Sequence, residues 1–115
     1  MSSYRDLEVW QKGVELAVEA YRVTASFPMA EQFGLTSQIR RAATSVPANI
    51  AEGQGRQSDA DFSRHLYIAR GSLLELSTHA EVAGRLTFLA DQPAFQLRIN
   101  EVGRLLNGLI RSIRP

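Results

Sequence analysis

Two long segments of this sequence repeat their apolar residues at alternating steps of four and three. This spacing places one apolar stripe along an α-helix and matches the 3.5-residue repeat of helices that pack at small left-handed crossing angles. The first segment begins near Ser58 and Asp61, which resemble a capping box, and the second begins at Asp91. The stripes are Phe62, Leu66, Ala69, Leu73, Leu76, Ala80 and Ala83, then Phe95, Ile99, Val102, Leu106, Leu109 and Ile113.

Two earlier segments also carry an apolar face at helical spacing. One runs from about Asp6 to Ser26, and the other from about Thr36 to Gln54 with Thr36 as the expected N-cap. Their faces are Leu7, Trp10, Val14, Ala17 and Tyr21, then Leu35, Ile39, Ala42, Val46 and Ile50. No segment alternates convincingly at period two, so we expect no strands. We predict an all-α fold, an antiparallel up-and-down four-helix bundle in which residues 1–115 form a single domain.

Pro47 lies inside the second expected helix. Proline removes one backbone donor and clashes with the carbonyl four residues earlier, here that of Ala43. We therefore expect the second helix to be kinked at Pro47, near Thr44 and Ser45, with Thr or Ser hydroxyls meeting the freed backbone groups. A clean break into two helices is the alternative.

The residue types that build most catalytic and metal sites are sparse. The chain has no cysteine, which excludes disulfides, thiol nucleophiles and Cys-ligated zinc. The Glu-x-x-His motif of di-iron bundles is absent, and no Gly-x-Ser-x-Gly elbow occurs. His65 and His79 lie too far apart on one expected helix to share an ion. We therefore predict that the protein is not an enzyme, and we expect no cofactor and no metal site.

The chain begins with polar residues, and its apolar runs are only a few residues long. A signal peptide needs a basic and then an apolar region, and a helix that crosses a bilayer needs about 20 apolar residues. We therefore expect a cytoplasmic protein with no membrane contact.

The charges are nearly balanced in total but unevenly distributed. The chain has 13 Lys plus Arg against 12 Asp plus Glu, for a net charge of +1, which excludes a uniformly basic binder. Lys12 is the only lysine, and arginine is the residue of bidentate carboxylate and phosphate contacts. The second and fourth expected helices are net positive, so a basic stripe could follow phosphates. The alternatives are a solvated helix face, or arginines that pair with acids on another subunit.

Several apolar residues lie off the expected helix faces. Val9 and Leu16 fall outside the first face, while Val18, Tyr67 and Ile68 sit further round their helices. These last three could cover a subunit interface. The alternative is that they are single apolar residues exposed to solvent, which are common on protein surfaces.

Three blocks of the sequence carry a family resemblance. They are Leu7-Glu8-Val9-Trp10, Gln38-Ile39-Arg40-Arg41-Ala42 and Val46-Pro47-Ala48-Asn49-Ile50-Ala51-Glu52-Gly53. With these blocks the chain resembles, over nearly its whole length, the bacterial four-helix-bundle family of the 23S rRNA intervening-sequence proteins. The resemblance implies an up-and-down bundle that assembles as a barrel-like homopentamer. A similar protein accompanies the reverse transcriptase of diversity-generating retroelements as a nucleic-acid-binding subunit. The partners so implied are further copies of the chain, RNA or DNA, and a reverse transcriptase or other protein.

We also expect structural roles for several of these residues. We expect Pro47 and Asn49 to build the kink. An ion-pair network of Glu52, Arg56, Arg40 and Arg70 could join the second and third helices.

The remaining arginines are the better candidates for ligand contact, and two function hypotheses follow. The nucleic-acid-binding candidates are Arg41, Arg104, Arg111 and Arg114. The first hypothesis is a homo-oligomeric accessory protein that binds nucleic acid through these side chains. The second is a protein-interaction scaffold, with no nucleic-acid binding, in which the arginines serve subunit or partner contacts.

Overall fold

The computed structural model describes residues 3–113, and these residues form four long α-helices with no strand. The helices are α1 (Glu8–Thr24), α2 (Leu35–Gln54), α3 (Asp59–Arg85) and α4 (Gln92–Ile113). Two short 3-10 helices, η1 (Tyr4–Asp6) and η2 (Met29–Glu31), precede α1 and α2. The prediction of an all-helical fold with four helices is confirmed.

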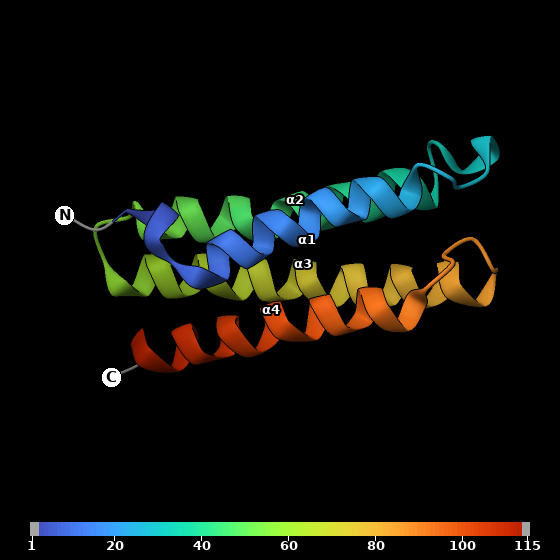
Figure 1. The fold of residues 1–115 in the computed structure, drawn as a ribbon. Coiled ribbons are helices and arrows are strands. Elements are labelled where there is room, and N and C mark those ends of the chain that lie inside the picture. Colours follow the sequence, from blue (N-terminus) through green and yellow to red (C-terminus); the bar gives the residue numbers. More distant parts are fainter. Residues whose placement is uncertain (1–2, 114–115) are drawn as a thin grey trace.

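The four helices lie alongside one another in an elongated body with extents of 44 × 23 × 20 Å (Figure 1). The start of α1, the connection from α2 to α3 and the end of α4 lie at one end, and the other two connections lie at the opposite end. Each helix packs on two others, in the cycle α1–α2–α3–α4–α1, and α2 with α3 forms the most extensive pair. Two helix pairs therefore face each other across the body, α1–α2 and α3–α4.

The helices α3 and α4 begin where the sequence predicts. The hydroxyl of Ser58 accepts a hydrogen bond from the backbone N–H of Asp61 at 3.1 Å, and the Asp91 carboxylate accepts from Ala94 N at 3.1 Å. The prediction of Thr36 as the N-cap of α2 is wrong, because Gly34 holds that position and Thr36 is buried. The η2 turn instead brings Glu31 Oε1 to 3.1 Å from Leu35 N, where its carboxylate accepts this orphan donor.

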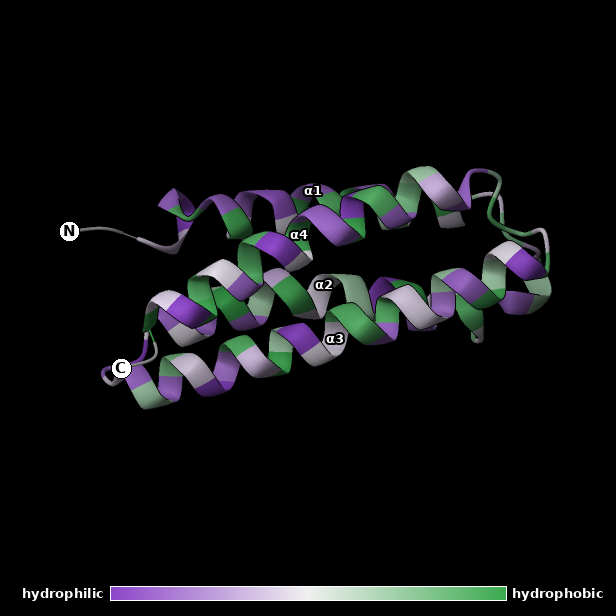
Figure 2. Ribbon diagram, turned by 90° about the horizontal axis from the view of Figure 1, so that it is seen from below, coloured by the Kyte–Doolittle hydropathy of each residue, from purple (hydrophilic) through white to green (hydrophobic). Residues whose placement is uncertain are grey.

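The core follows the expected stripes in α2, α3 and α4. Apolar and polar bands alternate along each helix in Figure 2, and the buried positions include almost every residue of the α3 stripe. In α1 the predicted face is correct only in part, because Ala17 is buried and Leu7 and Trp10 pack against the core, but other positions differ. Val9 and Leu16, which fell outside it, are 4% and 1% exposed, whereas Tyr21 is 48% exposed. The stripe that α1 buries is Val9, Gly13, Leu16, Ala17, Ala20 and Thr24.

The helix α2 continues through Pro47, so it does not break into two helices there. Neighbouring side chains hydrogen-bond to backbone carbonyls around the proline. The hydroxyl of Thr44 donates to the Arg40 carbonyl at 3.0 Å, and Asn49 Nδ2 donates to the Ser45 carbonyl at 2.9 Å. The proline ring packs against α1, where a β-carbon built on Gly13 would lie 3.4 Å from Pro47 Cβ. The kink itself stays a prediction.

Candidate nucleic-acid interface

A groove runs between α3 and α4 on the surface of the bundle. Its larger part has a volume of about 580 Å³, and an adjoining part adds about 400 Å³. The two parts share Leu73, Leu74, Gly103 and Asn107, so we treat them as one feature, the α3–α4 groove. Further lining residues are Tyr67, Arg70, Ser77, Gln96, Ile99, Asn100, Arg104, Ile110 and Arg111.

The floor of the groove is apolar and lacks a side chain at one position. Leu73 is buried beneath it. On the opposite helix, a β-carbon built on Gly103 would lie 3.4 Å from Leu73 Cδ2. The glycine therefore leaves open the space that a larger residue would fill.

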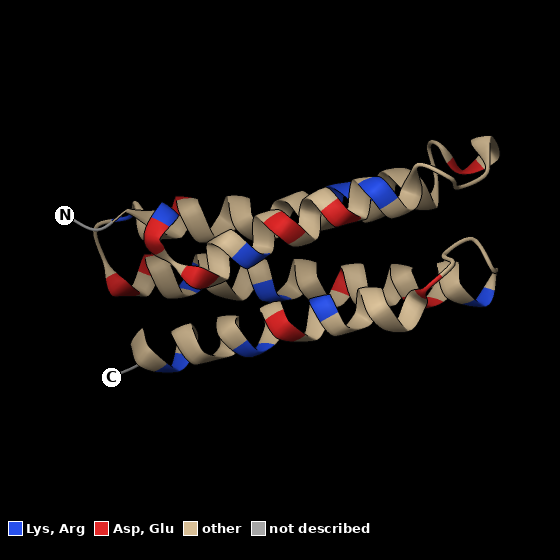
Figure 3. Cartoon of the chain, in the orientation of Figure 1, with Lys and Arg blue, Asp and Glu red and all other residues tan. Residues whose placement is uncertain are grey.

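The rim of the groove is basic. Arg70 of α3 and Arg104 and Arg111 of α4 line it, and its lining contains no Asp or Glu. Within residues 3–113, none of these three arginines forms an ion pair. Basic positions recur along α4 in Figure 3. Three guanidinium groups without carboxylate partners form a site to which an anion would be attracted.

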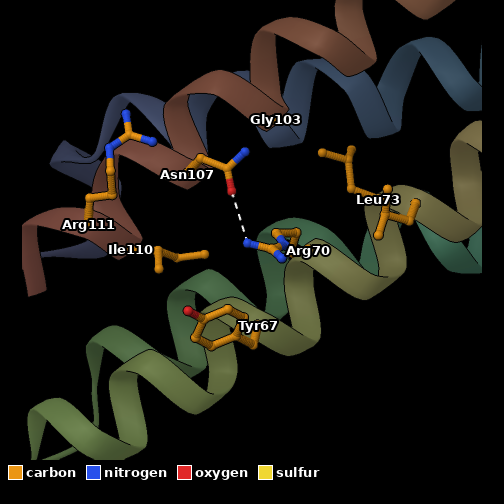
Figure 4. Close-up of a pocket in the computed structure, with 8 residues that line it drawn as sticks. Tyr67, Arg70, Leu73, Gly103, Asn107, Ile110 and Arg111 are labelled. Atoms are coloured by element: carbon orange, nitrogen blue, oxygen red, sulfur yellow. Dashed lines mark hydrogen bonds between the residues drawn. The ribbon is translucent and has the colours of Figure 1, made fainter. Parts of the chain in front are cut away.

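Arg70 is held inside the groove by its neighbours. Its Nη1 donates to Asn107 Oδ1 at 3.3 Å, and its guanidinium carbon lies 5.2 Å from the centre of the Tyr67 ring. Figure 4 shows Tyr67 and Arg70 projecting from α3 toward Ile110 and Asn107 of α4. This cation–π pair orients Arg70 across the groove.

The expected four-residue ion-pair network does not form. Arg70 faces α4, as described above, and Arg40 faces α1. The Arg40 Nε donates to Thr24 Oγ1 at 2.8 Å, and its guanidinium carbon lies 4.5 Å from the Tyr21 ring centre. The reason is geometric, because these two arginines lie on helix faces that point away from the α2–α3 contact. Of the network, only the pair between Glu52 and Arg56 is present, at 2.6 Å.

The α2–α3 contact near Glu52 is closed by Gly53 and a buried histidine. His65 is 4% exposed, its Nδ1 lies 2.9 Å from the Asp61 carbonyl, and its Nε2 lies 3.6 Å from Glu52 Oε1. A β-carbon on Gly53 would lie 2.7 Å from His65 Cβ, so the close approach of α2 and α3 requires this glycine. By contrast, nothing lies within 4 Å of a β-carbon built on Gly71 of α3. In the part of the chain that is described, no cluster of three or more His, Asp or Glu could hold a metal ion.

The structure brings together two of the four predicted ligand arginines. Arg104 and Arg111 both line the groove, while Arg41 is exposed on α2, away from it. Arg114 lies outside the described residues.

Sequence reasoning missed two features of the groove, namely the contribution of Gly103 and the groove position of Arg70. One signal was available, since Tyr67 and Arg70 stand at the i,i+3 spacing of helix neighbours.

A second hollow lies on the opposite side, between α1 and α2. Its volume is about 340 Å³, and no charged residue lines it. The lining residues are Val14, Ala17, Val18, Tyr21, Thr44 and Pro47. The two sides of the bundle therefore differ in chemistry, one apolar and one basic.

These features define an all-helical protein that carries a basic surface groove. The profile of the 23S rRNA-intervening sequence protein family matches residues 5–108, and the chain belongs to this family. The fold is also similar to the crystal structure of a protein of unknown function from the S23 ribosomal protein family of Bacteroides thetaiotaomicron VPI-5482. That chain is 28% identical with a TM-score of 0.83, and the alignment covers 90% of this chain and 95% of that one. No curated protein matches the sequence. None of the described helices is both long and apolar enough to cross a membrane.

Proposed function

We propose that this protein is a non-enzymatic, homo-oligomeric accessory factor that binds RNA through the α3–α4 groove of an antiparallel four-helix bundle. One observation carries the proposal: three arginines gather in the groove and no carboxylate lines it. Arginine binds phosphate through a planar fork, and contacts of this kind supply most of the affinity of a protein for a nucleic-acid backbone. Neither histidine lines the groove, which supports a binding role without catalysis.

The assembly part of the proposal is a pentamer, as the family resemblance implies, and the short apolar runs of the sequence favour a location in the cytoplasm. Large apolar side chains that are mostly exposed are candidates for burial between subunits. Phe33, Met29 and Leu97 are 90%, 81% and 68% exposed. A ring of copies would repeat the groove and so raise the avidity for a long RNA.

The test is a titration of a labelled RNA hairpin that has single-stranded ends with the protein. Fluorescence anisotropy reports binding, and the titration is repeated at several salt concentrations. The variant is Arg104→Gln with Arg111→Gln, and the matched control is Arg22→Gln with Arg85→Gln. The control arginines are exposed and pair with Glu19 and Glu81 of their own helices. We expect the groove variant to bind more weakly and to lower the slope of log affinity against log salt by about two, while the control binds as the parent does. Absence of binding at low salt would overturn the proposal.

A second candidate function, the protein-interaction scaffold, is favoured by a match between two faces of the same chain. Glu8 and Glu15 are exposed on α1 one heptad apart, which is the spacing of Arg104 and Arg111 on α4. Both pairs therefore span a rise of about 10 Å. In a ring, the α1–α2 side of one copy would pack on the α3–α4 side of the next through a heterologous interface. If this is the role, the groove variant changes the mass of the assembly and leaves RNA affinity unaltered.

A further inference from the structure

The α3–α4 groove has an aromatic ring at its mouth. Tyr67 is 41% exposed and lies beside Arg70, whose guanidinium is 5.2 Å from the ring centre (Figure 4). Exposed aromatic rings next to arginines in a basic channel are the platforms on which unpaired bases stack, because every base has a π-face. Arg104 and Arg111 follow the same groove along α4.

The width of the groove favours a single strand over a duplex. Packed helices have axes about 8–10 Å apart, and the groove lies between two of them. The bases of a duplex are stacked inside the helix, so a duplex can offer only its backbone to this rim. An unpaired strand can place a base against the Tyr67 ring and its backbone along α4.

The groove also offers amide groups that suit base edges. Asn107 Oδ1 accepts the hydrogen bond from Arg70, and within residues 3–113 its Nδ2 group donates to no other residue. Asn100 and Gln96, which line the adjoining part, are bonded to each other at 2.9 Å. A carboxamide can donate to or accept from the exposed edge of an unstacked base.

From these observations we infer that the groove recognises an unpaired segment of RNA, with a base stacked on Tyr67 and phosphates held by Arg104 and Arg111. This inference rests on the proposed function and specifies its ligand. The two arginines, about 10 Å apart along the helix, would hold separate phosphates of one strand that runs along α4. Arg70 would stay against Tyr67 and contribute its charge.

The experiment compares a labelled single-stranded oligoribonucleotide with the same strand annealed to its complement, by anisotropy at one salt concentration. We expect the single strand to bind at least about ten-fold more tightly than the duplex. Tyr67→Ala should weaken single-strand binding by about ten-fold, within the range measured for base–aromatic stacking, and leave duplex binding unaltered. Tyr67→Phe keeps the ring and should bind as the parent does.

The matched control is Tyr21→Ala. Tyr21 is 48% exposed and also lies beside an arginine, Arg40 at 4.5 Å, but it lines the hollow between α1 and α2 and not the α3–α4 groove. This variant should leave single-strand binding intact. Far-ultraviolet circular dichroism and mass measurements on each variant separate lost stacking from lost folding or assembly.

Four results would overturn the inference. Equal binding of the single strand and the duplex would remove the stacking role, and so would an unaltered RNA affinity of Tyr67→Ala. In either case, weaker RNA binding by the variant with Arg104→Gln and Arg111→Gln would still support the proposed function. Failure of both RNAs to bind removes the inference and the proposed function together. Loss of assembly without loss of RNA binding in the arginine variants assigns the groove to a second copy of the chain.

Discussion

Arg40 joins α2 to the last turn of α1, because its Nε donates a 2.8 Å hydrogen bond to the hydroxyl of Thr24. That hydroxyl is buried and in turn donates to the Ala20 carbonyl at 2.7 Å, so one threonine satisfies a charged donor and a helix carbonyl. The Tyr21 ring lies 4.5 Å from the same guanidinium and completes its surroundings. This contact replaces the expected pairing of Arg40 with Glu52.

Replacing Arg40 by alanine should destabilise the protein by about 1–3 kcal/mol. The change removes a hydrogen bond from a charged donor and a cation–π contact. Urea unfolding followed by circular dichroism measures the effect. Arg41→Ala is the control, since Arg41 is exposed and forms no ion pair within residues 3–113, and its cost should stay within about 0.5 kcal/mol. Equal costs for the two variants would contradict this role of Arg40.

Replacing either of two glycines by alanine should change the free energy of unfolding, but in opposite directions. Gly71→Ala should raise the free energy of unfolding by about 0.5–1 kcal/mol, because alanine is the better helix former and a β-carbon there meets nothing within 4 Å. Gly53→Ala should lower it, because the new β-carbon would lie 2.7 Å from His65 Cβ and force α2 away from α3. Thermal unfolding of both variants checks the signs. A stabilised Gly53→Ala would show that the helices separate at little cost.

The buried face of α1 can be tested with two substitutions two residues apart. Leu16→Ala should cost about 2–5 kcal/mol, because Leu16 is 1% exposed and its loss leaves a cavity. Val18→Ala should cost about 0.5 kcal/mol or less in the monomer, because Val18 is 44% exposed. Denaturant unfolding compares them at one protein concentration. The reverse order would contradict the buried stripe that the structure gives α1.

The assembled protein should have five times the mass of the 12.8 kDa chain when measured by light scattering. Phe33→Ser with Met29→Ser should shift the population toward smaller species, because both side chains are largely exposed in the single chain. The control is Pro28→Ala, because Pro28 is also exposed in the same connection. This variant shows whether any substitution in the connection changes the assembly. A parent protein that stays monomeric at high concentration would contradict the assembly.

The stripes of α3 and α4 could be predicted because their buried apolar residues recur at regular steps of four and three along each helix. In α1 two faces carry apolar residues, and the buried stripe includes Gly13 and Ala20, whose small side chains give a weak apolar signal. Trp10 lies on the predicted face, and the structure packs it against the core. It is half-buried because the η1 turn covers it, with the Tyr4 ring 5.2 Å away, a contact that periodicity cannot show.

The groove was predictable only in part. Arg104 and Arg111 share a face of one helix, so their spacing alone places them together. The position of Arg70 depends on Asn107, which is 37 residues away in the chain and lies on another helix. Which side chains meet across two helices depends on how each helix is rotated about its own axis. The apolar pattern of a sequence determines that rotation only approximately.

The connection between α2 and α3 consists of only residues 55–58, and these two helices make the most extensive contact in the bundle. Closing so short a loop costs little chain entropy, and contacts between nearby segments of the chain favour rapid folding. We therefore expect the α2–α3 hairpin to form the folding nucleus, and α1 and α4 to pack onto it later. The α3–α4 groove is completed by α4, so local opening of α4 would dismantle the groove while the hairpin stays folded.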